Sequence, residues 1–147
     1  MAAVDFEQLV GAIGDAIVVT DAAGAITLWN PACERMFGFT QAEALGQSLD
    51  LIIPERLRKR HWEGYEKTMH TGITKYGTDL LKVPAVDKDG RAMSIAFTVA
   101  MLRSADGKPT AIAAVIRDET IRFNEERGLR KRLAELEART SSTDISA

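Results

Sequence analysis

The segment RHWEGYEKTMHTG holds both histidines of the chain and offers the clearest metal-binding chemistry in the sequence. Leu57, His61, Tyr65 and Met69 recur every four residues, which places them along one face of a helix. We expect that face to look into the core. A buried imidazole needs a hydrogen-bond partner or a metal, because an unpaired polar group in an apolar site costs about 1–3 kcal/mol. His61 is therefore either a hydrogen-bonded core residue or a metal ligand.

The second histidine of the segment has a simpler interpretation. His70 stands at the end of the expected helix, between Met69 and Thr71, and is predicted to be exposed to solvent. Cys33 is the only cysteine of the chain, so neither an intrachain disulfide nor a zinc site of several thiolates can form. It is expected to be a small buried residue.

Length and charge limit the class of protein. A chain of 147 residues fits one domain, and a formal net charge of −2 argues against a protein built to hold nucleic acid. No apolar stretch approaches the roughly 18–20 residues that span a bilayer, so we expect no membrane partner. The N-terminus lacks the basic start and apolar block of a signal peptide, and the sequence therefore predicts a cytoplasmic protein.

Hydrophobic periodicity predicts the elements that position these residues. The strand expected at 92–102 alternates well: Met93, Ile95, Phe97 and Val99 are large and apolar, whereas the residues between them are small or polar.

Thr40 is the expected N-cap of one helix, and Pro54 and Gly72 bound the longest helix, whose basic run RLRKR at 56–60 is expected to be a solvated face. Asp21 and Gly24 of the DAAG stretch are the expected turn formers of a hairpin. Besides that hairpin at 16–31, the other expected elements are a helix at 5–13, helices between Pro31 and Gly72, and strands at 79–86 and 110–118. This order predicts an α+β fold, a five-stranded antiparallel sheet with helices on one face.

Both ends of the chain lie outside this core. The expected organisation is an N-terminal amphipathic helix at 1–13, a core domain at 14–120, a helix at 121–139 and a disordered polar tail at 140–147. Leu129, Leu133 and Leu136 form a stripe of about one and a half heptads, too short for a stable isolated coiled coil. We therefore expect the two terminal helices to pack together in a parallel homodimer.

The middle of the chain resembles a PAS sensory domain. The stretch WNPACERMFGFTQAEALGQSLDLIIPE carries Asn30, Phe37, Gly38, Gly46 and Pro54 at the family's usual places. The stretch IRDET resembles the end of the family's last strand and the start of its signalling helix. The resemblance implies the PAS fold, a sensory role without enzymatic activity, and a signal that leaves through the flanking helices.

Within that family, the segment PERLRKRHWEGYEKTMHTG is most similar to haem-binding PAS domains of the FixL and RcoM types. There, a histidine at the position of His61, seven residues after Pro54 and eleven before Gly72, is the proximal iron ligand. The resemblance implies b-type haem bound through Nε2 of His61, with a backbone carbonyl or water on Nδ1. HWEGY followed by TKYGTDLLKVPA is closer to the RcoM type.

The same resemblance assigns further residues to a haem pocket. Oxygen-sensing relatives carry an arginine twenty residues after the histidine, where it can donate to bound O₂, whereas this chain has Leu81 there. Without that donor, the apolar distal side should favour CO or NO over O₂, or should allow an internal sixth ligand. Met93 is the candidate for that ligand. Lys67 and Lys75 occupy the positions that hold the propionates, and Tyr76 is placed at the rim. The expected walls are Leu57, Tyr65, Leu81 or its neighbour Leu80, Met93, Ile95, Phe97 and Val99.

These observations predict a haem-binding PAS sensor that detects a diatomic gas or the redox state and signals to an unidentified downstream protein. Two other functions stay open at this point. One is a cofactor-free PAS module for dimerisation, and the other is a PAS receptor for a flavin or a small metabolite in the same pocket.

Overall fold

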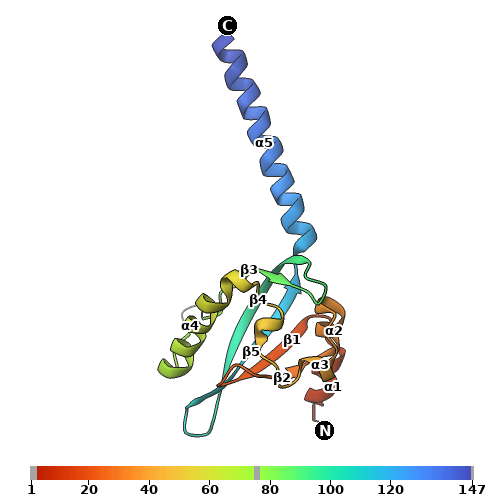
Figure 1. Cartoon of the computed structure of the whole chain (residues 1–147), viewed down its shortest axis with the longest axis vertical. Coiled ribbons are helices and arrows are strands. Elements are labelled where there is room, and N and C mark those ends of the chain that lie inside the picture. Colours follow the sequence, from red (N-terminus) through yellow and green to blue (C-terminus); the bar gives the residue numbers. More distant parts are fainter. Residues whose placement is uncertain (1–2, 75–76, 147) are drawn as a thin grey trace.

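The computed structural model describes the whole chain except residues 1–2, 75–76 and 147. Helices flank a central sheet, and the longest helix ends the chain and projects from the domain (Figure 1). None of the described helices is both long and apolar enough to cross a membrane. In chain order the elements are α1 (Phe6–Ala12), β1 (Ala16–Asp21), β2 (Ile26–Trp29), α2 (Pro31–Phe37), α3 (Gln41–Ala44), η1 (Leu49–Leu51), α4 (Glu55–Thr71), β3 (Leu81–Val86), β4 (Ala92–Arg103), β5 (Pro109–Asp118) and α5 (Thr120–Ser146).

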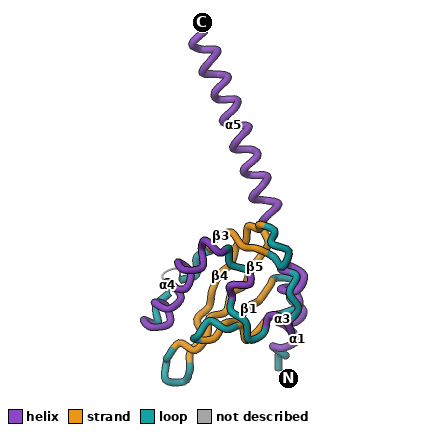
Figure 2. Tube along the Cα trace, in the orientation of Figure 1, coloured by secondary structure: helices purple, strands orange, loops and turns teal. Residues whose placement is uncertain are grey.

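The five strands form one sheet in the order β2-β1-β5-β4-β3, and all neighbouring strands run antiparallel. Helices α2, α3 and α4 lie over one face of this sheet (Figure 2). Both observations confirm the predicted α+β class and the predicted PAS architecture. The turn at Asp21–Gly24, which joins β1 to β2, has Gly24 in the left-handed region at φ 88°, as expected for the DAAG sequence.

The core fills the space between the sheet and the helical layer. Trp29 and Phe37 are fully buried there, with ring centroids 5.6 Å apart, and the indole of Trp29 donates to the carbonyl of Phe39 at 2.9 Å. From β4, Met93 and Ile95 join this core. The alternation predicted for the strand is therefore confirmed at these two positions.

Asn30 connects α1 to the core. The buried side chain caps α2 by accepting from Cys33 N, and the same oxygen accepts from Ile17 N. Its amide nitrogen donates to the carbonyls of Val10 and Asp15. One amide thereby fixes the C-terminal end of α1 against β1 and α2.

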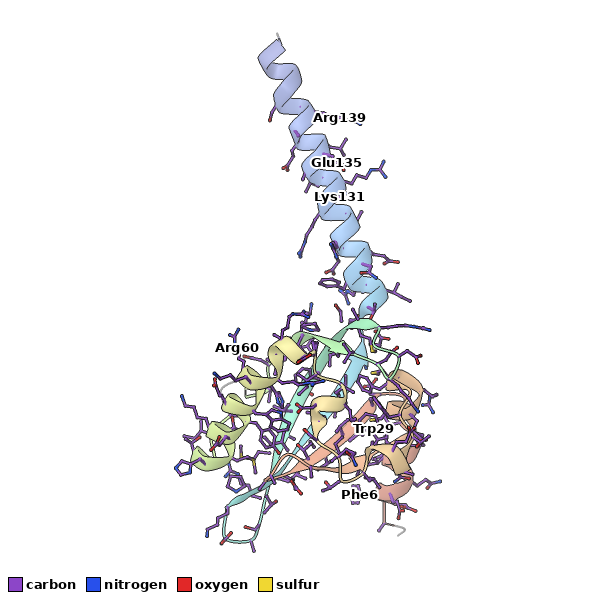
Figure 3. All side chains as sticks on the ribbon, viewed as in Figure 1. Phe6, Trp29, Arg60, Lys131, Glu135 and Arg139 are labelled. Carbon is purple, nitrogen blue, oxygen red and sulfur yellow. The ribbon has the colours of Figure 1, made fainter. Side chains whose placement is uncertain are left out.

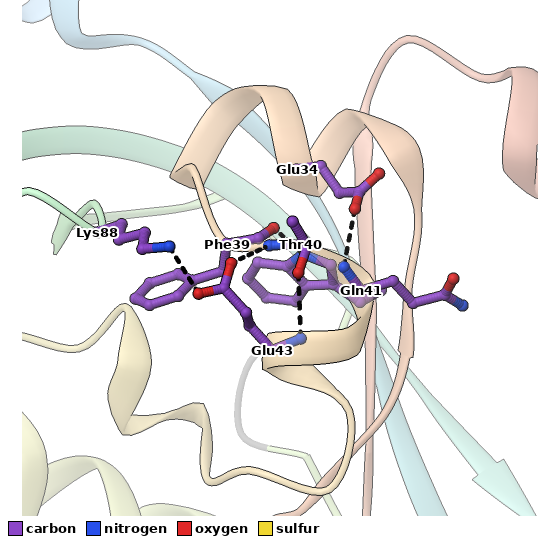
Figure 4. Close-up of polar contacts among 7 residues, drawn as sticks. Glu34, Phe39, Thr40, Gln41, Glu43 and Lys88 are labelled. Atoms are coloured by element: carbon purple, nitrogen blue, oxygen red, sulfur yellow. Dashed lines mark hydrogen bonds and ion pairs between the residues drawn. The ribbon is translucent and has the colours of Figure 1, made fainter.

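A polar cluster fastens the helical layer to the β3–β4 turn (Figure 4). Thr40 and Glu43 form a reciprocal capping box at the start of α3, which confirms Thr40 as the predicted N-cap. Glu43 also binds Lys88 at 2.6 Å, and this ion pair holds the pKa of the carboxyl at about 2. Glu34 accepts from Gln41 N at 2.8 Å, so α2 and α3 are joined as well.

The last helix differs from the sequence prediction in length. α5 runs from Thr120 to Ser146, whereas the sequence predicted an end at residue 139 and a disordered tail at 140–147. Neither glycine nor proline follows Gly128, so no helix breaker stops it, and the Thr140 hydroxyl donates back to the carbonyl of Leu136.

The two terminal helices leave the domain in different directions. α5 projects away from the sheet, and the chain's N-terminus lies at the opposite end of the molecule (Figure 1). Figure 3 shows Lys131, Glu135 and Arg139 on α5 far from Phe6. Within one chain, the apolar stripes of α1 and α5 are therefore not side by side, and each needs its own partner surface.

Candidate functional site

Helix α4 carries the histidine and lies over the sheet. It begins after Pro54 and ends at Gly72, whose φ of 72° forms a left-handed C-cap, so both predicted boundaries are confirmed. The predicted inward-facing stripe is only partly buried. Its four residues are all half-buried, and no residue of α4 is fully buried. The helix therefore covers the sheet without packing tightly against it. The stripe consists of Leu57, His61, Tyr65 and Met69.

His61 has an unsatisfied polar atom. Its Nδ1 is buried and has no hydrogen-bond partner among the described residues. The resemblance to haem-binding PAS domains predicts a backbone carbonyl or a water on this atom, with Nε2 as the metal ligand; no such carbonyl is found among the described residues. Burial lowers the pKa of His61, although the Asp50 carboxylate acts in the opposite direction. The neutral imidazole, which is the metal-binding form, is therefore favoured at neutral pH.

Two aromatic residues attach α4 to its neighbours, Tyr65 to the β1–β2 hairpin and Trp62 to η1. The hydroxyl of Tyr65 donates to the carbonyl of Asp21 and lies 3.0 Å from the hydroxyl of Thr20. The indole of Trp62 donates to Asp50 at 2.7 Å, and its ring lies 4.5 Å from that of His61. These contacts fix the position of the histidine on its helix.

Trp62 was missed by the sequence reasoning, because its contact with the hairpin turn joins residues 38 positions apart. In the structure, a Cβ added at Gly24 would lie 2.4 Å from the Trp62 ring, so the glycine of the hairpin turn makes room for the indole. Gly24 was predicted only as a turn former. Thr20 and Asp50 were also missed, since a strand threonine and a loop aspartate give no periodic signal.

The sheet supplies an apolar wall opposite α4. Leu81 pairs with Phe97, and Ala85 pairs with Met93, so these side chains share one face of the sheet. Leu81 and Phe97 are half-buried, whereas Met93 and Ile95 are buried in the core. Of the two leucines considered, Leu81 lies on this face, and Leu80, before the strand, is 58% exposed.

Val99 lies farther along the same face. It pairs with Ala114 of β5 and is half-buried. Met93, Ile95, Phe97 and Val99 thus share one face of the sheet, and burial decreases along β4 from Met93 and Ile95 to Phe97 and Val99.

The predicted cationic residues are placed less favourably. Lys67 lies on the exposed face of α4, in a shallow hollow that it shares with Glu63, Glu66 and His70. Exposure of His70 confirms its predicted surface position. Lys75 and Tyr76 lie outside the described residues.

A different cation lies close to the stripe. Arg58 is half-buried one residue after Leu57, and its guanidinium donates to the carbonyls of Ile53 and Asp50. Sequence reasoning grouped it with a basic surface run. Its hydrogen bonds instead stiffen the entry to α4.

An open hollow of about 520 Å³ lies between the β1–β2 turn and α4. Ala22 and Ala23 form one side, and Trp62, Tyr65 and Met69 line the other. The hollow shares two residues, Tyr65 and Met69, with the inward stripe. It therefore gives solvent a route to the edge of the histidine site.

Cys33 is buried, as predicted, and lies apart from these residues. Its thiol donates to the carbonyl of Ile17 at 3.2 Å, and burial raises its pKa to about 12. A thiol in this state is a poor nucleophile at neutral pH.

Several known proteins are similar to this chain in sequence. It is 33% identical over 118 residues to an uncharacterised protein of Azorhizobium caulinodans, covering 80% of this chain and 16% of the relative. It is 45% identical over 49 residues to the sensor protein FixL of Bradyrhizobium diazoefficiens, covering 33% of this chain and 10% of FixL. It is 27% identical over 96 residues to the oxygen sensor protein DosP of Escherichia coli, covering 65% and 12%. The chain thus spans less than a fifth of each relative's length.

Solved structures share the fold at lower identity. The PAS domain of a Colwellia psychrerythraea protein superposes with a TM-score of 0.68 at 21% identity, covering 78% of this chain and 94% of that one. An RNA-binding light-oxygen-voltage receptor superposes with a TM-score of 0.70 at 20% identity, covering 88% and 36%. The family model for the PAS fold matches residues 5–118, most of the chain. This chain therefore belongs to the PAS family of sensory domains.

Proposed function

We propose that this PAS domain is a haem-binding sensor of a diatomic gas or of redox state, with His61 as the proximal iron ligand. The observation that carries the proposal is the buried Nδ1 of His61, which has no hydrogen-bond partner among the described residues. A buried ring nitrogen without a partner costs about 1–3 kcal/mol. With iron on Nε2, a water on Nδ1 would remove that cost, and the absence of a hydrogen bond from the described residues at Nδ1 leaves the imbalance for such a site to correct. Burial also favours the neutral ring that binds iron.

The surroundings of His61 suit a flat apolar group. The stripe of α4 is only half-buried, and Leu81 and Phe97 on the facing sheet are half-buried as well. Such side chains still expose apolar surface, and an apolar ring placed against them would complete their burial. The residues that would hold the haem are His61, Leu57, Tyr65, Leu81, Met93, Ile95, Phe97 and Val99, with Lys67, Lys75 and Tyr76 at the propionates and rim.

The bound group would supply an iron atom that binds CO, NO or O₂. The chain's own residues set the selectivity. Leu81 has no hydrogen-bond donor in its side chain and stands where oxygen-sensing relatives carry an arginine, so this wall excludes water and offers no donor to bound O₂. CO or NO should therefore be preferred, and Met93 is proposed as an internal sixth ligand.

A short route connects the pocket wall to the last helix. Ser94 lies between Met93 and Ile95 on β4, and its backbone N–H donates to the hydroxyl of Thr120 at 3.1 Å. The carbonyl of Ser94 accepts from Glu119 N at 2.8 Å. A displacement of β4 at the pocket would be passed directly to the first residue of α5.

Beyond that point, the signal requires a second molecule. Leu129, Leu133 and Leu136 on α5 are 49–68% exposed, and such a stripe is buried when two copies pack together. We propose a homodimer that passes the signal through α5 to a downstream protein. Gas binding is proposed to change the angle at which the two α5 helices leave their domains.

The absorbance spectrum of freshly expressed protein tests this proposal. A strong Soret band with about one haem per chain is the expected result. A band near 450 nm would instead favour a flavin receptor, and a colourless protein that takes up no haemin would favour the cofactor-free dimerisation module. Either result would overturn the haem assignment.

A further inference from the structure

The open hollow between the β1–β2 turn and α4 has the size of a small-molecule site. Its volume of about 520 Å³ lies within the usual range for pockets that hold small ligands. Among the described residues, its lining includes Tyr65 and Met69 of the inward stripe but neither His61 nor any residue of β3, β4 or β5. The hollow therefore lies beside the proposed haem pocket and not inside it.

Two aromatic rings form the α4 side of this hollow. The ring centroids of Trp62 and Tyr65 lie 5.2 Å apart and the ring planes meet at 73°, so the two rings form a corner. Aromatic cages bind quaternary ammonium groups, because an electron-rich ring attracts a cation that has no N–H to donate. Tryptophan is the strongest aromatic partner of a cation.

Both rings are held by hydrogen bonds to residues outside the hollow. Trp62 Nε1 donates to Asp50 at 2.7 Å, and the Tyr65 hydroxyl donates to the carbonyl of Asp21. Gly24 fits the same arrangement, since a Cβ there would lie 2.4 Å from the Trp62 ring. The polar atoms of both rings are thus satisfied elsewhere, and the hollow meets ring carbons in fixed positions. Binding against such pre-ordered side chains costs little entropy.

A carboxylate completes the lining. Glu66 borders the hollow, whereas no lysine or arginine of the described residues does so. The Glu66 side chain forms no ion pair or hydrogen bond with another described residue, so its charge is available to a ligand. Lys67 borders the adjoining hollow, together with Glu63. A cation would therefore be attracted by the rings and by the carboxylate at once.

The remaining residues suit the methyl groups of such a cation. Ala22 and Ala23 of the turn carry methyl groups, and Met69 has a flexible, polarizable thioether. A primary ammonium group would bring three N–H donors into a lining made largely of carbon, whereas a fully alkylated ammonium group needs no acceptor. The lining therefore favours the alkylated cation.

We propose that this hollow binds a free small molecule of the quaternary ammonium class, about the size of choline, between the Trp62–Tyr65 corner and the Glu66 carboxylate. The domain would then be a receptor for an organic cation at a site separate from His61. This binding requires no haem, so a haem-free protein that binds choline would support the hollow and refute only the haem assignment.

Choline and its uncharged analogue neohexyl alcohol, in which a carbon atom replaces the nitrogen, test the proposal. Each is titrated into the isotopically labelled full chain, and the indole N–H signals are followed in proton–nitrogen correlation spectra. The chain has two tryptophans, and the buried Trp29 is the internal reference. We expect choline to shift the Trp62 signal saturably, and the uncharged analogue to bind at least about tenfold more weakly.

Two variants of equal charge test the role of the carboxylate. Glu66→Gln removes the carboxylate of the hollow, whereas Glu63→Gln removes the same charge from an exposed position that borders only the adjoining hollow. We expect Glu66→Gln to weaken choline binding about fivefold and Glu63→Gln to change it less than about twofold. Trp62→Leu, with folding verified by circular dichroism, should weaken binding about tenfold or more.

Three outcomes would overturn the proposal. Equal binding of choline and neohexyl alcohol would mean that the hollow does not recognise charge. A Trp62 shift that does not saturate at tens of millimolar choline would mean that there is no specific site. Equal losses in Glu66→Gln and Glu63→Gln, or full binding by a folded Trp62→Leu chain, would place the cation elsewhere on the molecule.

Discussion

Gly24→Ala should lower the free energy of unfolding more than alanine at other turn glycines does, because it adds both backbone strain and a steric overlap. Gly24 has a φ of 88°, and a non-glycine residue in the left-handed region costs about 1–2 kcal/mol. The new Cβ would also lie 2.4 Å and 2.6 Å from two atoms of the Trp62 ring. That ring cannot turn away freely, because its N–H is bonded to Asp50 at 2.7 Å.

The overlap with Trp62 adds about 1–3 kcal/mol, the usual cost of forcing a packed group to move, so the total loss in the free energy of unfolding should be about 2–5 kcal/mol. Gly46→Ala is the matched control. Gly46 has a similar φ of 82°, but a Cβ there meets nothing within 4 Å, so only the backbone cost applies. Urea denaturation followed by far-ultraviolet circular dichroism measures both variants.

A double-mutant cycle isolates the contact itself. In a Trp62→Leu background, the cost of Gly24→Ala should fall to that of Gly46→Ala, because the ring that it strikes is gone. Equal losses for Gly24→Ala and Gly46→Ala in the wild-type background would refute the view that the turn is shaped around Trp62.

Three further substitutions test other parts of the account. Glu43→Gln should destabilise the protein at about pH 6 but make little difference near pH 2. The pKa of this carboxyl falls from 4.5 to about 2 on folding, so its stabilisation is present above pH 4.5 and is lost as the pH falls to about 2. A constant difference between the variants in urea melts at several pH values would contradict this. Leu81→Arg should slow O₂ release by adding a donor on the distal side, and stopped-flow rates equal to wild type would count against that role. Met93→Leu, a volume-conserving change, should convert a six-coordinate ferrous haem spectrum to a five-coordinate one, and an unchanged spectrum would remove the thioether from the coordination sphere.

Local patterns were enough to predict most of the fold. The Thr40 cap and the Pro54 and Gly72 boundaries of α4 each depend on a few neighbouring residues and are confirmed. The alternation in β4 is confirmed at Met93 and Ile95, whereas Ala96, predicted to face outward, is buried as well. α5 runs on to Ser146, past the predicted end at residue 139, and residues 129–146 contain neither glycine nor proline to interrupt it.

The candidate site was harder to predict because its contacts are long-range. Trp62 approaches Gly24 and bonds to Asp50, and Tyr65 bonds to Asp21, across 12 to 44 positions of the sequence. Helical spacing correctly placed His61 on the inward stripe but did not reveal that its Nδ1 lacks a partner. The hollow lined by Trp62 and Tyr65 likewise joins α4 to Ala22 and Ala23, which lie far from it in the sequence.

Haem stoichiometry in His61 variants tests the central claim most directly. Wild type, His61→Ala and His70→Ala are expressed side by side, and haem per chain is measured by the pyridine haemochrome method, with circular dichroism to verify folding. His70 is the matched control, since it lies on the same helix but is exposed. We expect about one haem per chain for wild type and His70→Ala and almost none for a folded His61→Ala. Equal haem content in wild type and His61→Ala would contradict the assignment of His61 as the iron ligand.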